Sequence, residues 1–222
     1  MTELELVAFD IETTGFTVED AVTVVGFAMP MGCRVFVQTS GRAASNVEAV
    51  VREQSGEHVI VSTHTSETRL LEAVGVFAGE RFQDAGVLLV AYNGERWKAG
   101  FDLPFLRTRL AALDVEWPFV EVPYADLLPI IQHRFNTTIG DDNTPGDLVT
   151  VYDLLCDGAY TGLDPFVDSQ EAVGAFEDGR FSELVLHNVA DILRTRALGR
   201  LAERYCSKSD FKLKSLTPTI HD

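Results

Sequence analysis

In this 222-residue sequence, lysine and cysteine are scarce and long apolar runs are absent, and each of these features excludes some classes of protein. Lysine occurs only four times, at positions 98, 208, 212 and 214. The three cysteines are far apart and show no Cys-x-x-Cys spacing, which argues against a disulfide framework or a zinc ribbon and favours reduced thiols. No apolar run is long enough to cross a bilayer, and the N-terminus has no signal-peptide pattern. We therefore expect a cytoplasmic protein without a membrane partner.

An excess of negative charge accompanies the shortage of lysine. The chain has 34 Asp and Glu against 18 Lys and Arg, a formal net charge of −16. Such a composition is typical of cytoplasmic proteins from extreme halophiles, and it would also suit an acidic protein that binds a basic partner. A negative field normally argues against a nucleic-acid partner. At molar salt, however, the screening length falls to about 3 Å, so that local contacts decide.

The apolar content of 46% favours a packed α/β domain rather than disorder. Strand patterns at the start of the chain, at 21–29 and at 33–38 predict three antiparallel strands. The continuous apolar run at 87–91 is typical of a central strand that is covered on both faces. A final helix is expected from about 181 to 204.

We assign residues 1–205 to one domain and residues 206–222 to a C-terminal tail, for which mobility is one interpretation. The tail holds three of the four lysines. Residues 39–58 are rich in Ser, Gly and acids around a weak helical patch, and we interpret them as an insertion at the edge of the sheet. Whether this insertion is a lid, an interface or a surface decoration is open.

Two carboxylates end the first predicted strand. Asp10 and Glu12 are two positions apart, which places them on the same face of a strand. Like charges held so close repel and raise each other's pKa unless a cation or protons neutralise them. A divalent metal is the natural occupant. A solvated acidic pair before a Thr-Thr-Gly turn explains this stretch equally well when it is taken alone.

Two more acids and a histidine occur at places where they could join this pair. Asp102 lies at the start of a predicted helix that follows the central strand, and an N-cap role would also explain it. His187 and Asp191 are four positions apart on the final helix, hence on one face. For these two residues alone, a local ion pair is the simpler interpretation.

Together these stretches resemble the DEDD superfamily of 3′-to-5′ exonucleases. The first motif matches at 9–15 (FDIETTG), the second at 92–94 (YNG) with 101–106 (FDLPFL), and the third is approximated at 186–192 (LHNVADI). Residues 168–198 look similar to the branch related to the proofreading domain of family B DNA polymerases. The resemblance implies a ribonuclease H-like α/β fold, with a mixed central sheet flanked by helices.

The resemblance also implies a metal site whose ligands would be Asp10, Glu12, Asp102 and Asp191. Two Mg²⁺ or Mn²⁺ ions suit oxygen ligands, and about 3.5–4 Å apart they stabilise both the attacking and the leaving oxygen at phosphorus. His187 would orient or deprotonate the attacking water. The expected activity is hydrolysis of the terminal phosphodiester of single-stranded nucleic acid, DNA rather than RNA, to nucleoside 5′-monophosphates. A partner protein in replication or repair is a further expectation.

The third motif departs from the family pattern. In the family, three residues separate a Tyr from the Asp, or four residues separate a His from it. Here three residues separate His187 from Asp191, so the histidine stands at the tyrosine spacing. It is therefore either a working base in a different pose or a relic in a weakened enzyme. Tyr160 and Asp164 also fit the tyrosine spacing, but Gly162 and Pro165 argue against the helix that this match requires. A catalytically silent binding or scaffolding module is the alternative function.

Three residues are expected from the resemblance to contact the substrate strand: Asn93, Thr13 and Thr14. Phe16 would pack either beside them or in the core. The stretch 95–100, which precedes the second carboxylate motif, is longer than the family pattern suggests. Trp97 and Lys98 in it would either stack on a base and touch a phosphate, or form an exposed loop.

Overall fold

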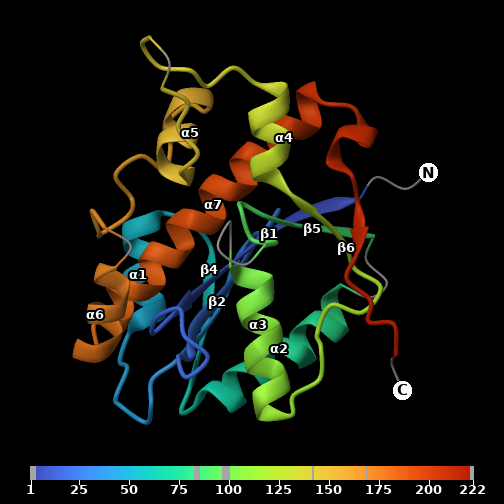
Figure 1. The fold of residues 1–222 in the computed structure, drawn as a ribbon. Coiled ribbons are helices and arrows are strands. Elements are labelled where there is room, and N and C mark those ends of the chain that lie inside the picture. The colour runs from blue at the N-terminus through green and yellow to red at the C-terminus, as the bar shows by residue number, and fades with distance from the viewer. Residues whose placement is uncertain (1–3, 83–85, 97–100, 142, 169, 221–222) are drawn as a thin grey trace.

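The computed structural model describes residues 4–82, 86–96, 101–141, 143–168 and 170–220 (Figure 1). Trp97 and Lys98 lie outside the described residues. Within the described part, seven strands form one mixed sheet in the order β4-β3-β2-β1-β5-β6-β7. Their bounds are β1 Glu5–Thr13, β2 Val22–Met29, β3 Gly32–Gln38, β4 Val59–His64, β5 Val87–Ala91, β6 Pro123–Asp126 and β7 Lys214–Ser215.

Helices cover both faces of this sheet (Figure 1). The described helices are α1 Val47–Ser55, α2 Glu67–Arg81, α3 Asp102–Leu113, α4 Leu127–Arg134, α5 Leu148–Leu155, α6 Glu171–Asp178, α7 Phe181–Tyr205 and the 3₁₀ helix η1 Lys208–Phe211. The α/β class and the mixed sheet flanked by helices agree with the prediction. Among the described helices, none combines the length and the apolar character that a membrane crossing requires.

The three strands at the start of the chain are antiparallel, as predicted: β1 pairs with β2, and β2 with β3. β5 lies parallel to β1 on its other side, and β6 lies parallel to β5. This arrangement places the C-terminal ends of β1, β5 and β6 at one edge of the sheet. Because side chains that follow neighbouring parallel strands meet at such an edge, the segment after 91 lies beside the end of β1, and the segment after 126 lies beside the end of β5.

Alternation along β1 sends its side chains into two separate cores. Val7, Phe9 and Ile11 pack on one face with α2 and α3. Leu6 and Ala8 pack on the opposite face, where α7 is the main covering helix. Asp10 and Glu12 continue the second series, so the period of the strand directs both carboxylates toward α7.

Residues 39–58 contain α1, which packs against α7 through Val47 and Val51. The following strand β4 extends the sheet by parallel pairing with β3. The C-terminal segment also contributes to the sheet as far as it is described. β7 pairs antiparallel with β6, and the carbonyl of the buried Leu216 accepts a hydrogen bond of 2.9 Å from Trp117 Nε1.

Candidate metal centre

Asp10 on β1 is held by a side chain of α7. Asn188 Nδ2 donates a hydrogen bond of 2.9 Å to Asp10 Oδ2, and Asn188 is fully buried. Gly26 on β2 stands opposite Asp10 in the strand register. A Cβ atom at Gly26 would lie 1.9 Å from Asn188 Oδ1, so glycine is needed for the asparagine to reach the carboxylate. Helix α7 and strand β1 thus contact each other directly through Asn188 and Asp10.

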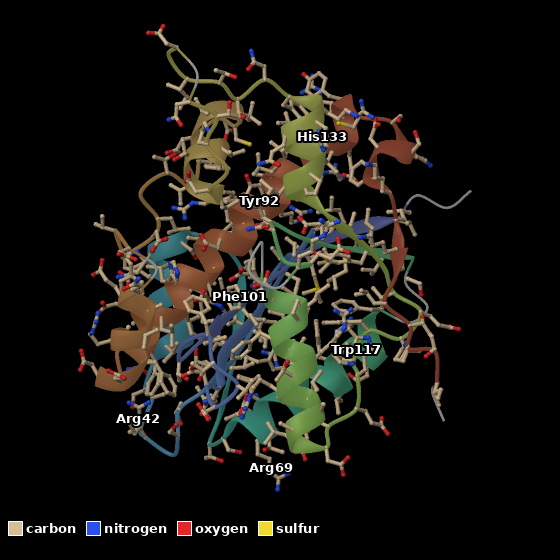
Figure 2. All side chains as sticks on the ribbon, viewed as in Figure 1. Arg42, Arg69, Tyr92, Phe101, Trp117 and His133 are labelled. Atoms are coloured by element: carbon tan, nitrogen blue, oxygen red, sulfur yellow. The ribbon has the colours of Figure 1, made fainter. Side chains whose placement is uncertain are left out.

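Asp102 is the first residue of α3 and is 3% exposed. The N-cap residue is Phe101, which Figure 2 shows at the N-terminal end of this helix, so Asp102 is not itself the N-cap. The turn after β5 packs closely on the carboxylate, since a Cβ atom at Gly94 would lie 2.6 Å from Asp102 Oδ2. The backbone fixes this approach through a 2.9 Å hydrogen bond from Leu103 N to Gly94 O.

His187 on α7 lies between two carboxylates. Its Nδ1 is 2.8 Å from both oxygens of Asp164, and its Nε2 is 3.7 Å from Glu12 Oε1. The imidazole is 5% exposed, and its ring packs against Phe166 at a centroid distance of 5.3 Å. These contacts direct one ring nitrogen toward a loop and the other toward the end of β1.

Asp191, one turn further along α7, is bound by a buried arginine. Arg194 Nη1 is 2.9 Å from Asp191 Oδ1 and 3.3 Å from Asp164 Oδ2, and Arg194 is 1% exposed. Asp164, His187 and Asp191 each place a possible ligand atom within 4.8 Å of the others. Because Arg194 donates to both acids of this group, the protein itself supplies a positive charge there.

The four predicted carboxylates act on one another electrostatically. Burial raises the pKa of Asp10 well above its usual range, and the charges of Asp102, Glu12 and Asp191 raise it further. Burial likewise raises the pKa of Asp102, to which Glu12 and Asp191 add. The pKa of Glu12 rises to about 7 through burial, although the neighbouring His187 opposes this shift. The four acids from β1, α3 and α7 therefore share one environment that disfavours their charged forms.

The same environment favours the charged form of the histidine. Burial alone would lower the pKa of His187, but the carboxylates of Glu12, Asp164 and Asp191 outweigh it and raise this pKa to about 10. Burial also raises the pKa of Asp191, against the opposing effects of His187 and Arg194. Without a divalent cation, the imidazolium and the guanidinium are thus the positive charges that contact this cluster among the described residues.

The two threonines expected at the substrate hold the turn that follows β1. Thr13 Oγ1 donates to the carbonyl of Gly15 at 2.7 Å. Thr14 Oγ1 donates to Asp20 Oδ1 and accepts from Ala21 N, both at 3.0 Å. Both hydroxyls are therefore engaged within residues 13–21, and these contacts do not test the expected role toward a nucleotide.

Asn93 and Phe16 were also considered for substrate contact; Asn93 is half-buried and Phe16 is exposed. Asn93 has a left-handed backbone with φ of 62°, and its N–H donates to Asp126 Oδ1 at 2.9 Å. Phe16 is 62% exposed, and its ring packs edge to face on Phe101 at 5.2 Å between centroids. Of the two positions considered for Phe16, the structure excludes the core.

Two residues of the site, Asn188 and Arg194, were not foreseen, and a third, Asp164, was considered only in the match with Tyr160 that the sequence argues against. Residues 158–166 form no helix, as Gly162 and Pro165 predict, so the tyrosine spacing at Tyr160 has no helical basis. The Tyr160 hydroxyl donates instead to Glu57 at 3.1 Å. Asp164 reaches His187 from this loop, a contact that no spacing in the sequence encodes. Asn188 lies within the third motif on α7 and Arg194 two residues after it, and a buried polar residue within an apolar helix face is the available signal.

No protein-family model matches this chain, and a search of the curated proteins finds no significant match. The resemblance to the DEDD exonucleases therefore remains a prediction from the motifs. The function is inferred below from the geometry and chemistry of the site.

Proposed function

We propose that this protein is a metal-dependent 3′-to-5′ exonuclease with a ribonuclease H-like fold, acting on single-stranded nucleic acid and on DNA in preference to RNA. The observation that carries the proposal is the convergence of four acids from three elements: Asp10 and Glu12 at the end of β1, Asp102 at the start of α3, and Asp191 on α7. Each is raised in pKa by burial, and in three of them the charges of other members contribute. Such a cluster is costly unless a cation neutralises it.

The donor set fits Mg²⁺ or Mn²⁺. The four candidate ligands offer carboxylate oxygens, which hard divalent cations prefer, and the described residues of the cluster include no thiol. Asp10, Glu12, Asp102 and Asp191 would hold two ions, which would supply charge neutralisation at phosphorus and activation of the attacking water. Arg194 already binds Asp191, so this carboxylate would be shared between the guanidinium and an ion.

In this proposal His187 accepts the proton of the attacking water. Its Nε2 faces the carboxylate cluster at 3.7 Å from Glu12 Oε1, while Nδ1 is occupied by Asp164 at 2.8 Å. A hydrogen bond from Nδ1–H to Asp164 leaves Nε2 as the nitrogen that accepts the proton. Neutralising Glu12 and Asp191 with cations removes two of the charges that raise the pKa of His187, which brings it toward the range that suits a general base. Asp164 acts through the histidine and is a positioning residue.

The test is the polarity and metal dependence of nucleotide release. Single strands of DNA and of RNA, labelled at either end, are incubated with the full chain in Mn²⁺, Mg²⁺ or EDTA at low and high KCl. The proposal expects early release of the 3′-terminal label as a 5′-mononucleotide in Mn²⁺ or Mg²⁺, and none in EDTA. Absence of release at every salt concentration, with binding of the strand retained, would instead support the silent binding module.

A further inference from the structure

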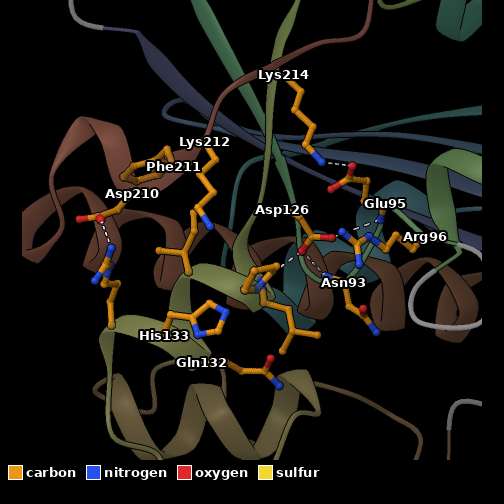
Figure 3. A pocket seen from close by; sticks show the side chains of 14 residues that line it. Asn93, Glu95, Arg96, Asp126, Gln132, His133, Asp210, Phe211, Lys212 and Lys214 are labelled. Carbon is orange, nitrogen blue, oxygen red and sulfur yellow. Dashed lines mark hydrogen bonds and ion pairs between the residues drawn. The ribbon is translucent and has the colours of Figure 1, made fainter.

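A cleft of about 740 Å³ lies beside the turn that follows β5 (Figure 3). Three segments line it: the turn after β5 at 93–96, helix α4 with Asp126 before it, and the C-terminal segment at 210–214. Asn93 and Asp126 connect the cleft to the metal centre. Asn93 precedes Gly94, which packs on the Asp102 carboxylate, and the charge of Asp126 acts on the pKa of Asp102. One end of the cleft therefore lies next to the candidate metal ligands.

Cations gather in this cleft although the chain is poor in them. Its lining includes two of the four lysines and two arginines: Lys212, Lys214, Arg96 and Arg134. Two of these are paired, since Arg134 Nη2 is 2.6 Å from Asp210 Oδ1 and Lys214 contacts Glu95. Arg96 and Lys212 make no ion pair within the part of the chain that the structure describes. Figure 3 shows their side chains reaching into the cleft from opposite sides.

The backbone is strained at two positions of the lining. Asn93 and Lys212 both have a left-handed conformation, with φ of 62° and 45°. Asparagine tolerates this region, whereas lysine seldom adopts it, and Lys212 stands at the C-terminal end of η1, where glycine would be favoured. Backbone strain of this kind persists where the side chain has a task. Lys212 thus adopts a backbone conformation that costs stability, and its side chain lines the cleft.

We propose that this cleft binds the phosphodiester backbone of the substrate strand on the 5′ side of the scissile bond, with Arg96 and Lys212 as its phosphate contacts. The inference rests on the proposed function, because a strand with its 3′ end at the carboxylates must continue away from them. The volume lies in the range of about 300–1,000 Å³ that holds small ligands, which suits a short stretch of unpaired strand. His133 and Gln132 on the α4 wall offer further polar groups.

The experiment measures binding of a 5′-fluorescein-labelled oligothymidylate in EDTA, where the protein's own cations supply the attraction. Anisotropy titrations run from about 0.1 to 1 M KCl, because each phosphate contact contributes roughly −0.7 to the slope of log K against log salt for a single strand. The test variant is Arg96→Gln with Lys212→Gly, in which the glycine also relieves the strained backbone. Lys208→Ala is the matched control, since Lys208 belongs to the same segment but lies outside the cleft.

We expect the double variant to bind more weakly at low salt, with a slope flatter by about 1.4, the loss of two contacts. The control should keep the wild-type slope, and thermal unfolding confirms that each variant is folded. An unchanged slope and affinity in the double variant overturns the proposal, as does the absence of salt-dependent binding by the wild type.

The two proposals fail in different ways. If the wild type binds the strand through Arg96 and Lys212 but releases no nucleotide with Mn²⁺, the exonuclease proposal fails and the cleft stands. If the wild type releases nucleotides while the double variant keeps the wild-type slope, only the cleft proposal fails.

Discussion

The buried acid Glu67 and the cluster of acids around Asp10 have opposite surroundings. Glu67 at the start of α2 is 8% exposed and is fully matched by donors. Its Oε1 accepts from Val22 N at 2.8 Å and from Arg109 Nε at 2.9 Å, while Arg109 Nη2 is 2.8 Å from its Oε2. Asp10 receives one amide hydrogen bond, from Asn188, and faces other acids.

Glu67 is therefore a carboxylate that stabilises the fold, whereas the acids around Asp10 destabilise it when they are charged. The Glu67–Arg109 pair ties α2 to α3 and to the start of β2, and breaking it would leave a buried charge without its partner. In the cluster around Asp10, like charges lie together, so removing one of them relieves repulsion. The proposed function assigns these less completely matched acids to an external cation.

The largest effect is expected from Asp10→Asn. Losing one ligand of the proposed ions should lower kcat/KM for nucleotide release by about a thousandfold or more, since a bound metal contributes several kcal/mol to the transition state. The metal-free variant should be at least as stable as the wild type, because one repelling charge is gone. Kinetics with Mn²⁺ and urea unfolding in EDTA measure the two effects. Wild-type activity in this variant would refute the assignment of the site.

Glu67→Gln should show the reverse pattern. We expect a loss of about 3–5 kcal/mol in the free energy of unfolding, because Arg109, whose side chain is only 12% exposed, keeps its charge without a carboxylate. Urea unfolding in EDTA measures it. Adding Arg109→Met should restore part of the loss, since the unmatched charge is then removed. If Glu67→Gln were neutral for stability, the contrast between the two groups of acids would not hold.

The pH dependence of stability tests the cluster without any substitution. In the metal-free protein, the folded-state pKa of Glu12 is raised from 4.5 to about 7, so folding favours the protonated form. Stability is then present below pH 4.5 and falls as the pH rises toward 7, by on the order of 3 kcal/mol for a shift of this size. His187, with its pKa raised to about 10, extends the decline above pH 6.5.

Urea unfolding at a series of pH values in EDTA measures this decline. Glu12→Gln should flatten the part below pH 7, and Mn²⁺ should do the same in the wild type by neutralising the carboxylates. A metal-free stability that rises between pH 4.5 and 7 would show that the cluster does not hold these acids in an unfavourable environment.

The smallest of these effects is expected from Asp164. Asp164→Ala releases Nδ1 of His187, and the loss of such a supporting contact costs about 10- to 100-fold in activity. The loss should appear in kcat, with little change in KM, because in this proposal Asp164 acts through His187 and not on the strand. Asp164→Asn keeps an acceptor for Nδ1–H and should recover part of kcat. Equal kcat in all three proteins would mean that the orientation of His187 does not matter.

The sequence by itself determined the local part of this site. Alternation along β1 fixes that Asp10 and Glu12 share a face, and the four-residue spacing on α7 does the same for His187 and Asp191. The three antiparallel strands, the central strand and the final helix follow from apolar patterns that each span one element. All of these features depend on a period of two or 3.6 residues, which a single stretch of chain displays.

Only the tertiary structure decided which partners the side chains have. Asp164 reaches His187 from an irregular loop, Asn188 reaches Asp10 because Gly26 leaves room, and Glu67 finds Arg109 across a separation of 42 residues. The C-terminal segment, expected as a separate tail, adds β7 to the sheet and lines the cleft. Contacts between distant segments depend on how the elements pack, and no local period encodes them.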